Sequence, residues 1–151
     1  MKYEALLAAA DEEGLRIKER PFSTYDGRIK GKDIYLRRGM TTTEKACVLA
    51  EELGHHYTSV GDIIDMKVAQ NRKQERQARF WAYNKLIGLR GIIQAYEAGC
   101  QNSYEIAEYL EVTEEYLQDC IECYRDKYGV GVEVDNFYIM FIPHLAVGKM
   151  I

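Results

Sequence analysis

The chain has 151 residues, of which 47% are hydrophobic and 29% charged, and it carries a formal net charge of −4 at pH 7. These values are ordinary for a soluble globular protein, and a chain of this length buries enough apolar surface to fold without disulfide bonds. No apolar run approaches the length of a membrane helix, and the N-terminal residues lack the basic start and cleavage site of a signal peptide. We therefore expect a cytoplasmic protein without a membrane partner, whose four cysteines are thiols and whose acidic balance weakens any expectation of nucleic-acid binding.

The N-terminal part of the chain predicts a helix followed by extended segments. Residues 2–13 have leucine and alanine at helical spacing. Residues 15–22 are typical of a strand, and residues 26–36 of a hairpin with Gly31 and Lys32 near its turn. The strand and the hairpin together predict a small antiparallel sheet.

Two long helices are expected next. Thr41 and Glu44 have the spacing of a capping box, which predicts the start of a helix over residues 42–58. The side chain of Asn71 can cap a second helix that runs to about residue 89. Helices that cover one face of a small sheet give an α+β fold.

The second half of the chain predicts two further helices within residues 103–128 and a hairpin within residues 130–151, with Asp135 and Asn136 in its turn. We expect one domain over residues 1–151. Its parts would be a core of about residues 1–95, a helical segment of about residues 100–129 that is similar in pattern to a helix-turn-helix, and the C-terminal hairpin.

Two features of this second half could suggest chemistry, but packing explains them better. Cys120 and Cys123 form a C-x-x-C pair inside a predicted helix, and no second pair or histidine cluster completes a zinc ribbon. His144 is a lone histidine in an apolar run and is expected to be structural. Redox or metal chemistry at the cysteines, and a place for His144 in a cleft, are the alternatives.

The helix over residues 42–58 contains a near match to the zinc-peptidase pattern H-E-x-x-H, in the segment EELGH. Glu51 and His55 are four residues apart and share a helix face, so both could bind one metal ion. Glu52 would stand beside that ion and could take a proton from a water molecule. Pairing His56 with Glu52 would put Leu53, which cannot accept a proton, in the position of the base. His56 is therefore a reserve ligand, or a group that contacts a ligand, and not a primary ligand. The plain alternative is a set of solvated charges.

Glu75 lies on an apolar stripe of the second long helix, together with Ala78, Ala82 and Leu86. A carboxylate on such a stripe is costly unless it is paired or bound to a cation. Glu75 is therefore a candidate third metal ligand, and an ion pair with a nearby arginine is the alternative.

The segments KACVLAEELGHHYTS and KQERQARFWAYNKLI, in this order and spacing, resemble the ImmA/IrrE family of phage- and mobile-element-associated metallopeptidases over about residues 25–90. The resemblance implies a Zn²⁺ endopeptidase that cleaves or otherwise inactivates a helix-turn-helix repressor encoded beside it. It implies Glu52 as the general base, His55 as a metal ligand and Glu51 as a substitute ligand.

The chain departs from the family pattern at two positions. Glu51 stands where the first ligand histidine is expected, and Gln77 stands where the second motif usually has its ligand glutamate, two positions after Glu75. A set of Glu51, His55 and Glu75 could bind Zn²⁺, but its two carboxylates favour harder ions such as Mn²⁺. The alternative is a non-catalytic antirepressor that keeps the fold and has lost the metal.

The expected helix pair within residues 103–128 is rich in glutamate. A DNA-reading helix would present basic or amide side chains to phosphates and base edges, which glutamates cannot replace. We therefore expect this pair to contact a protein and not DNA, and its acidic face suits a basic partner such as a repressor.

Overall fold

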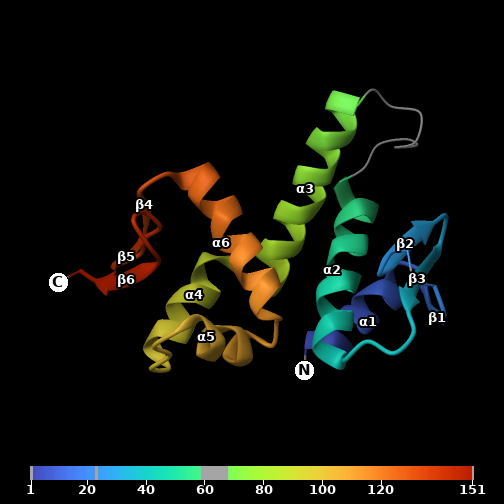
Figure 1. Cartoon of the computed structure of the whole chain (residues 1–151), viewed down its shortest axis with the longest axis horizontal. Coiled ribbons are helices and arrows are strands. Elements are labelled where there is room, and N and C mark those ends of the chain that lie inside the picture. The colour runs from blue at the N-terminus through green and yellow to red at the C-terminus, as the bar shows by residue number, and fades with distance from the viewer. Residues whose placement is uncertain (1, 23, 59–67, 151) are drawn as a thin grey trace. The chain divides into compact units, whose positions relative to one another are not determined.

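The computed structural model describes residues 2–22, 24–58 and 68–150, and the side chains of these residues other than 68–71 (Figure 1). The chain divides into two compact units, Met1–Lys85 and Leu86–Ile151. In the described residues each unit combines helices with one three-stranded sheet, which confirms the α+β class. The expectation of one domain over residues 1–151 stays a prediction.

The first unit contains the hairpin and both long helices expected from the sequence. Its elements are α1 (Lys2–Glu12), β1 (Arg16–Arg20), β2 (Gly27–Lys30), β3 (Asp33–Arg37), α2 (Thr42–Thr58) and α3 (Val68–Leu86). The predicted capping box is present at the start of α2. The backbone N–H of Glu44 donates to Thr41 Oγ1 at 3.1 Å, and that of Thr41 donates to Glu44 Oε1 at 2.9 Å.

The sheet of the first unit is mixed, whereas the sequence led us to expect an antiparallel one. β2 and β3 form the predicted antiparallel hairpin, but β1 pairs in parallel with the other edge of β3, which gives the order β1-β3-β2. The central strand β3 therefore runs antiparallel to β2 and parallel to β1. Ile34 and Leu36 make β3 the most buried strand of the three, consistent with its central place.

One face of this sheet is covered by helices. α1 contacts β1, and α2 contacts β2 and β3. Ile34 and Leu36 point to this side and are fully buried. Successive residues of a strand point to opposite faces, so Asp33, Tyr35 and Arg37 lie on the other face of the sheet.

The second long helix has different ends from those predicted. α3 begins at Val68, so Asn71 lies inside the helix and not at its N-cap, and α3 ends at Leu86. Gly88 follows with φ +67, a left-handed conformation that breaks the helix, and a separate helix α4 (Gly88–Glu97) begins there. The sequence did not lead us to expect α4, because the two glycines in its first half reduce helix propensity. The burial of Ile92 and Ile93 stabilises this helix.

The remaining elements of the second unit are α5 (Ser103–Leu110), α6 (Glu114–Tyr128), β4 (Gly131–Val134), β5 (Phe137–Met140) and β6 (Ala146–Lys149). The helix pair predicted within residues 103–128 is confirmed. Asn102 and Thr113 cap the two helices through their side chains. Among the described helices, none combines the length and apolarity that a bilayer crossing requires.

The C-terminal hairpin is part of a three-stranded sheet. β4 and β5 pair around Asp135, which has φ 55 as a tight hairpin turn requires. β6 then adds to the free edge of β5. The expected hairpin is therefore correct but incomplete, since β6 has only one β-branched residue and contains a glycine, which gives no strand signal in the sequence.

The C-x-x-C pair lies in α6. Cys120 is buried and Cys123 is half-buried. Burial raises the pKa of both thiols, so neither is a reactive thiolate at neutral pH. This environment supports the packing interpretation.

Candidate functional site

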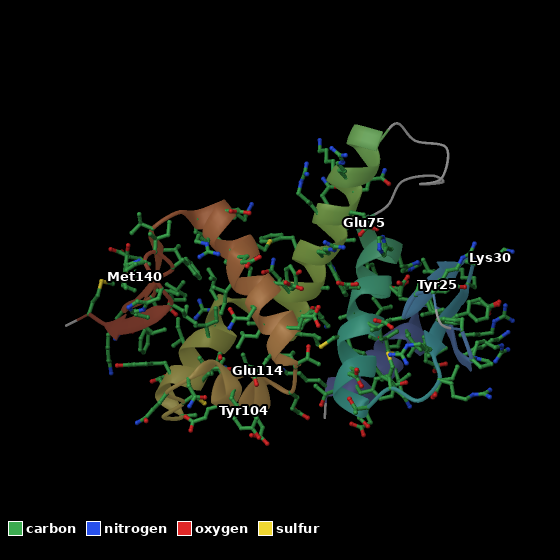
Figure 2. All side chains as sticks on the ribbon, in the orientation of Figure 1. Tyr25, Lys30, Glu75, Tyr104, Glu114 and Met140 are labelled. Atoms are coloured by element: carbon green, nitrogen blue, oxygen red, sulfur yellow. The ribbon has the colours of Figure 1, made fainter. Side chains whose placement is uncertain are left out.

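A cavity of about 440 Å³ opens between α2, α3 and the edge strand β2, all within the first unit. Its lining includes Glu51, Glu52, His55 and Glu75. Figure 2 shows Glu75 on α3 beside the C-terminal half of α2. The four residues expected at the site from the sequence therefore line one cavity.

A glycine brings the two helices of the cavity together. Gly54 is buried in α2, and a Cβ atom at this position would overlap the backbone carbonyl oxygen of Ala78 in α3. Only a residue without a side chain allows the backbones to approach so closely. The next residue, His55, then reaches Glu75, which lies almost one turn before Ala78.

His55 and Glu75 form an ion pair across this contact. The distance from His55 Nε2 to Glu75 Oε1 is 3.1 Å, and Arg79 Nε lies 3.7 Å from Glu75 Oε2. The hydrogen bond to Glu75 raises the pKa of His55, although burial opposes this shift, and the same bond lowers the pKa of Glu75. Glu75 is thus paired with a histidine as well as with the neighbouring arginine considered from the sequence.

Glu52 is the buried carboxyl group of the cavity. Glu52 is only 8% exposed. Burial raises its pKa to about 7, and the nearby Glu51 and Glu75 raise it while His55 lowers it. A carboxylate with a pKa near neutrality can both accept and return a proton at physiological pH.

The backbone of β2 covers Glu52. A Cβ atom at Gly27 would overlap Val48 and would lie 3.2 Å from Glu52 Oε1. Glycine therefore lets the strand approach the carboxyl group and exclude water from it. Sequence reasoning missed this contribution of β2, and the only signal was the glycine itself, in a strand where glycine often marks a close backbone approach.

The pKa of Glu52 predicts a dependence of stability on pH. Because its pKa is raised from 4.5 to about 7 on folding, the folded protein binds more protons than the unfolded chain between these values, and stability falls as the pH rises through them. Glu52→Gln removes this penalty, so its stability relative to the wild type should increase by about 2–3 kcal/mol between about pH 5 and about pH 8.

Urea unfolding of both proteins in the presence of a chelator would measure this difference. A difference in unfolding free energy that stays constant across the pH range would show that Glu52 titrates as a solvated group.

The other candidate residues lie apart from this group. His56 does not line the cavity, and its Nε2 lies 3.7 Å from Glu13 Oε2. Gln77 is exposed and lines a different cavity with Trp81. His144 belongs to the second unit, where it is exposed and lines a cavity of that unit.

The donor set can be compared with what a metal ion requires. Two ligands of a tetrahedral Zn²⁺, each about 2.0 Å from the ion, are about 3.3 Å apart, close to the 3.1 Å between His55 Nε2 and Glu75 Oε1. Among the residues that the structure describes, His55 Nδ1 has no hydrogen-bond partner and is buried, whereas a metal-bound histidine usually donates from its second nitrogen.

Across the part of the chain that the structure describes, no three His, Cys, Asp or Glu side chains are placed together as a metal-binding group. The residues therefore fit a divalent cation in their chemistry and in the spacing of one ligand pair. Glu51 lines the same cavity as that pair.

Comparison with known proteins identifies the family. The family model described as Peptidase_M78, IrrE N-terminal-like domain, matches residues 10–121. No curated protein and no solved structure matches the chain. The family match extends over most of the chain and includes both helices and the strand that form the cavity. The chain therefore belongs to the Peptidase_M78 family, as the resemblance to ImmA/IrrE metallopeptidases predicted.

Proposed function

We propose that the protein is a metal-dependent endopeptidase of the cytoplasm that cleaves or inactivates a helix-turn-helix repressor of a phage or mobile element. The observation that carries this proposal is the position of Glu52. It is buried in a cavity beside the His55–Glu75 pair, and it occupies the base position of the E-E-L-G-H segment. Membership of a metallopeptidase family supports the same class of reaction.

The residues of the cavity have separate roles in this proposal. His55 Nε2 and the Glu75 carboxylate would hold the cation, with Glu51 as its third ligand. Zn²⁺, or Mn²⁺ given the two carboxylates, would supply Lewis acidity toward the carbonyl group of the substrate. The Glu52 carboxylate takes a proton from the attacking water and returns it to the leaving amine.

The edge strand β2 is suited to hold the substrate. It pairs with β3 on one side and lies at the edge of the sheet, and Gly27 to Ile29 line the cavity. An extended peptide can add to such an edge through backbone hydrogen bonds. A peptide bound there would run past Glu52, which lies against Gly27.

The acidic helix pair supports a basic protein as the partner. Exposed carboxylates follow one another along α5 and α6, at Glu105, Glu108, Glu114, Glu115, Asp119 and Glu122. Opposite charge on a partner would increase the association rate and disfavour binding of nucleic acid to this surface. A DNA-binding repressor has the required basic charge.

A non-catalytic antirepressor is the second candidate, and one observation favours it. Glu51 replaces the histidine of the usual pattern, and within the described residues no three His, Cys, Asp or Glu side chains form a metal-binding group. In this case the cleft binds the repressor but does not hydrolyse it.

Intact-mass measurement of the cognate repressor after incubation with the purified protein tests the proposal. Hydrolysis would give two fragments whose masses sum to that of the repressor plus one water. A repressor that leaves its operator DNA but keeps its full mass would instead establish the non-catalytic function.

A further inference from the structure

The charge of the chain is divided unevenly between its two units. Residues 1–85 carry 16 Lys and Arg against 13 Asp and Glu, whereas residues 86–151 carry 4 against 11. The first unit is therefore basic, although the net charge of the whole chain is −4. Its basic residues concentrate in and around the three-stranded sheet.

The sheet places these cations on the face opposite to the helices. The register of β1, β2 and β3 aligns alternate residues across the three strands. The basic sheet face consists of Arg16, Lys18, Arg20, Arg28, Lys30 and Arg37, which surround Tyr35. Figure 2 shows Lys30 extending from the end of β2 away from α2.

Only part of this positive charge is neutralised. Asp33 is held by Arg16 at 2.7 Å and by Lys18 at 3.7 Å, and Asp26 pairs with Arg37 at 2.9 Å. Among the residues that the structure describes, the other three cations of the face, Arg20, Arg28 and Lys30, form no ion pair, and all three are exposed.

Aromatic rings alternate with these unpaired cations. Arg20 lies over the ring of Tyr35 at 5.8 Å, and Arg28 lies over the ring of Tyr25 at 5.9 Å. Tyr25 is 39% exposed and stacks on Phe22. The arginines are thus oriented by the rings, and the face offers both cations and flat aromatic surface.

We propose that the basic sheet face binds single-stranded nucleic acid. A phosphodiester strand carries regularly spaced charge whatever its sequence, and its bases stack on aromatic side chains, so it matches both features of the face. Duplex DNA is read by a helix or a two-stranded ribbon that enters its groove, and the broad face of a three-stranded sheet provides neither. An acidic peptide would match the charge but would leave the tyrosine rings without flat partners.

Fluorescence anisotropy with a labelled homopolymeric single strand tests this proposal. Three unpaired cations predict that log K falls with log salt concentration with a slope of about −2, from about 0.7 per phosphate contact. The double variant Arg20→Ala/Lys30→Ala should reduce this slope to about −0.7 and weaken binding by about tenfold at low salt. The matched control is Arg72→Ala/Lys73→Ala, which removes the same charge from exposed positions of α3 and should leave binding unchanged.

Three results would overturn the proposal. One is an equal loss of affinity in the control variant, which would indicate attraction by net charge alone. The second is equal or tighter binding of a duplex. The third is displacement of the strand by poly-glutamate at the same charge concentration, which would point to an acidic protein as the ligand. None of these results depends on whether the cavity of the first unit hydrolyses a peptide.

Discussion

Glu52→Gln is expected to slow cleavage of the repressor by about 10²–10⁴-fold, the usual contribution of a general base. The amide keeps the shape of the side chain but cannot accept a proton from water. Because Glu52 is not among the proposed ligands, the fold and the content of bound metal should change little. The rate of fragment formation, measured under single-turnover conditions with the purified repressor, gives the effect directly.

A matched control for this change is Glu12→Gln, which makes the same substitution at an exposed position at the end of α1. It should cleave at the wild-type rate. If Glu52→Gln cleaves as fast as this control, Glu52 is not the base, and the proton transfer must be assigned to another group.

Gly54→Ala is expected to destabilise the protein by about 1–3 kcal/mol, as overpacked sites do. The added methyl group would overlap the carbonyl oxygen of Ala78, and because this oxygen belongs to the backbone no side-chain rotation can relieve the overlap. The helices must separate, which also moves His55 away from Glu75. The loss should appear although alanine has a helix propensity up to about 1 kcal/mol better than that of glycine.

Gly91→Ala is the control for this prediction. Gly91 is also buried in a helix, but a Cβ atom there would make ordinary contact with Leu110 Cδ2 at 3.4 Å. Its unfolding free energy should equal or exceed that of the wild type. Equal stability of the Gly54 and Gly91 variants in denaturant unfolding would mean that α2 and α3 do not depend on a glycine contact.

The position of the site along the helices could be predicted from the sequence. Residues four apart on a helix share a face, which placed Glu51 and His55 together, and the apolar stripe around Glu75 indicated that its carboxylate needs a partner. Both arguments depend on helical periodicity alone. They required no knowledge of which elements meet in the folded chain.

The environment of Glu52 could not be predicted in this way. The burial of Glu52 depends on the strand β2, which packs closely against α2 because position 27 is a glycine. The sequence pattern does not show that β2 and α2 are in contact. The parallel pairing of β1 with β3 was missed for a similar reason. A hairpin turn determines which two strands pair with each other. The position of the third strand depends on the burial of Ile34 and Leu36 in the assembled sheet.

The difference between the two proposed functions also depends on tertiary placement. The sequence shows a glutamate at position 51 where the usual pattern has histidine. The proposed peptidase requires that carboxylate to complete a cation site with His55 and Glu75, and the proposed antirepressor does not.

The content of bound metal in protein purified without chelator tests the central claim most directly. A metallopeptidase site predicts about one equivalent of Zn²⁺ or Mn²⁺ per chain by elemental mass spectrometry, after exposure to either ion and removal of the excess. His55→Ala should lose this metal, because it removes the one nitrogen ligand of the proposed set, whereas His56→Ala should retain it. Less than about one tenth of an equivalent in the wild-type protein after this treatment would contradict the account, because a site with three protein ligands should keep Zn²⁺ bound while the excess is removed.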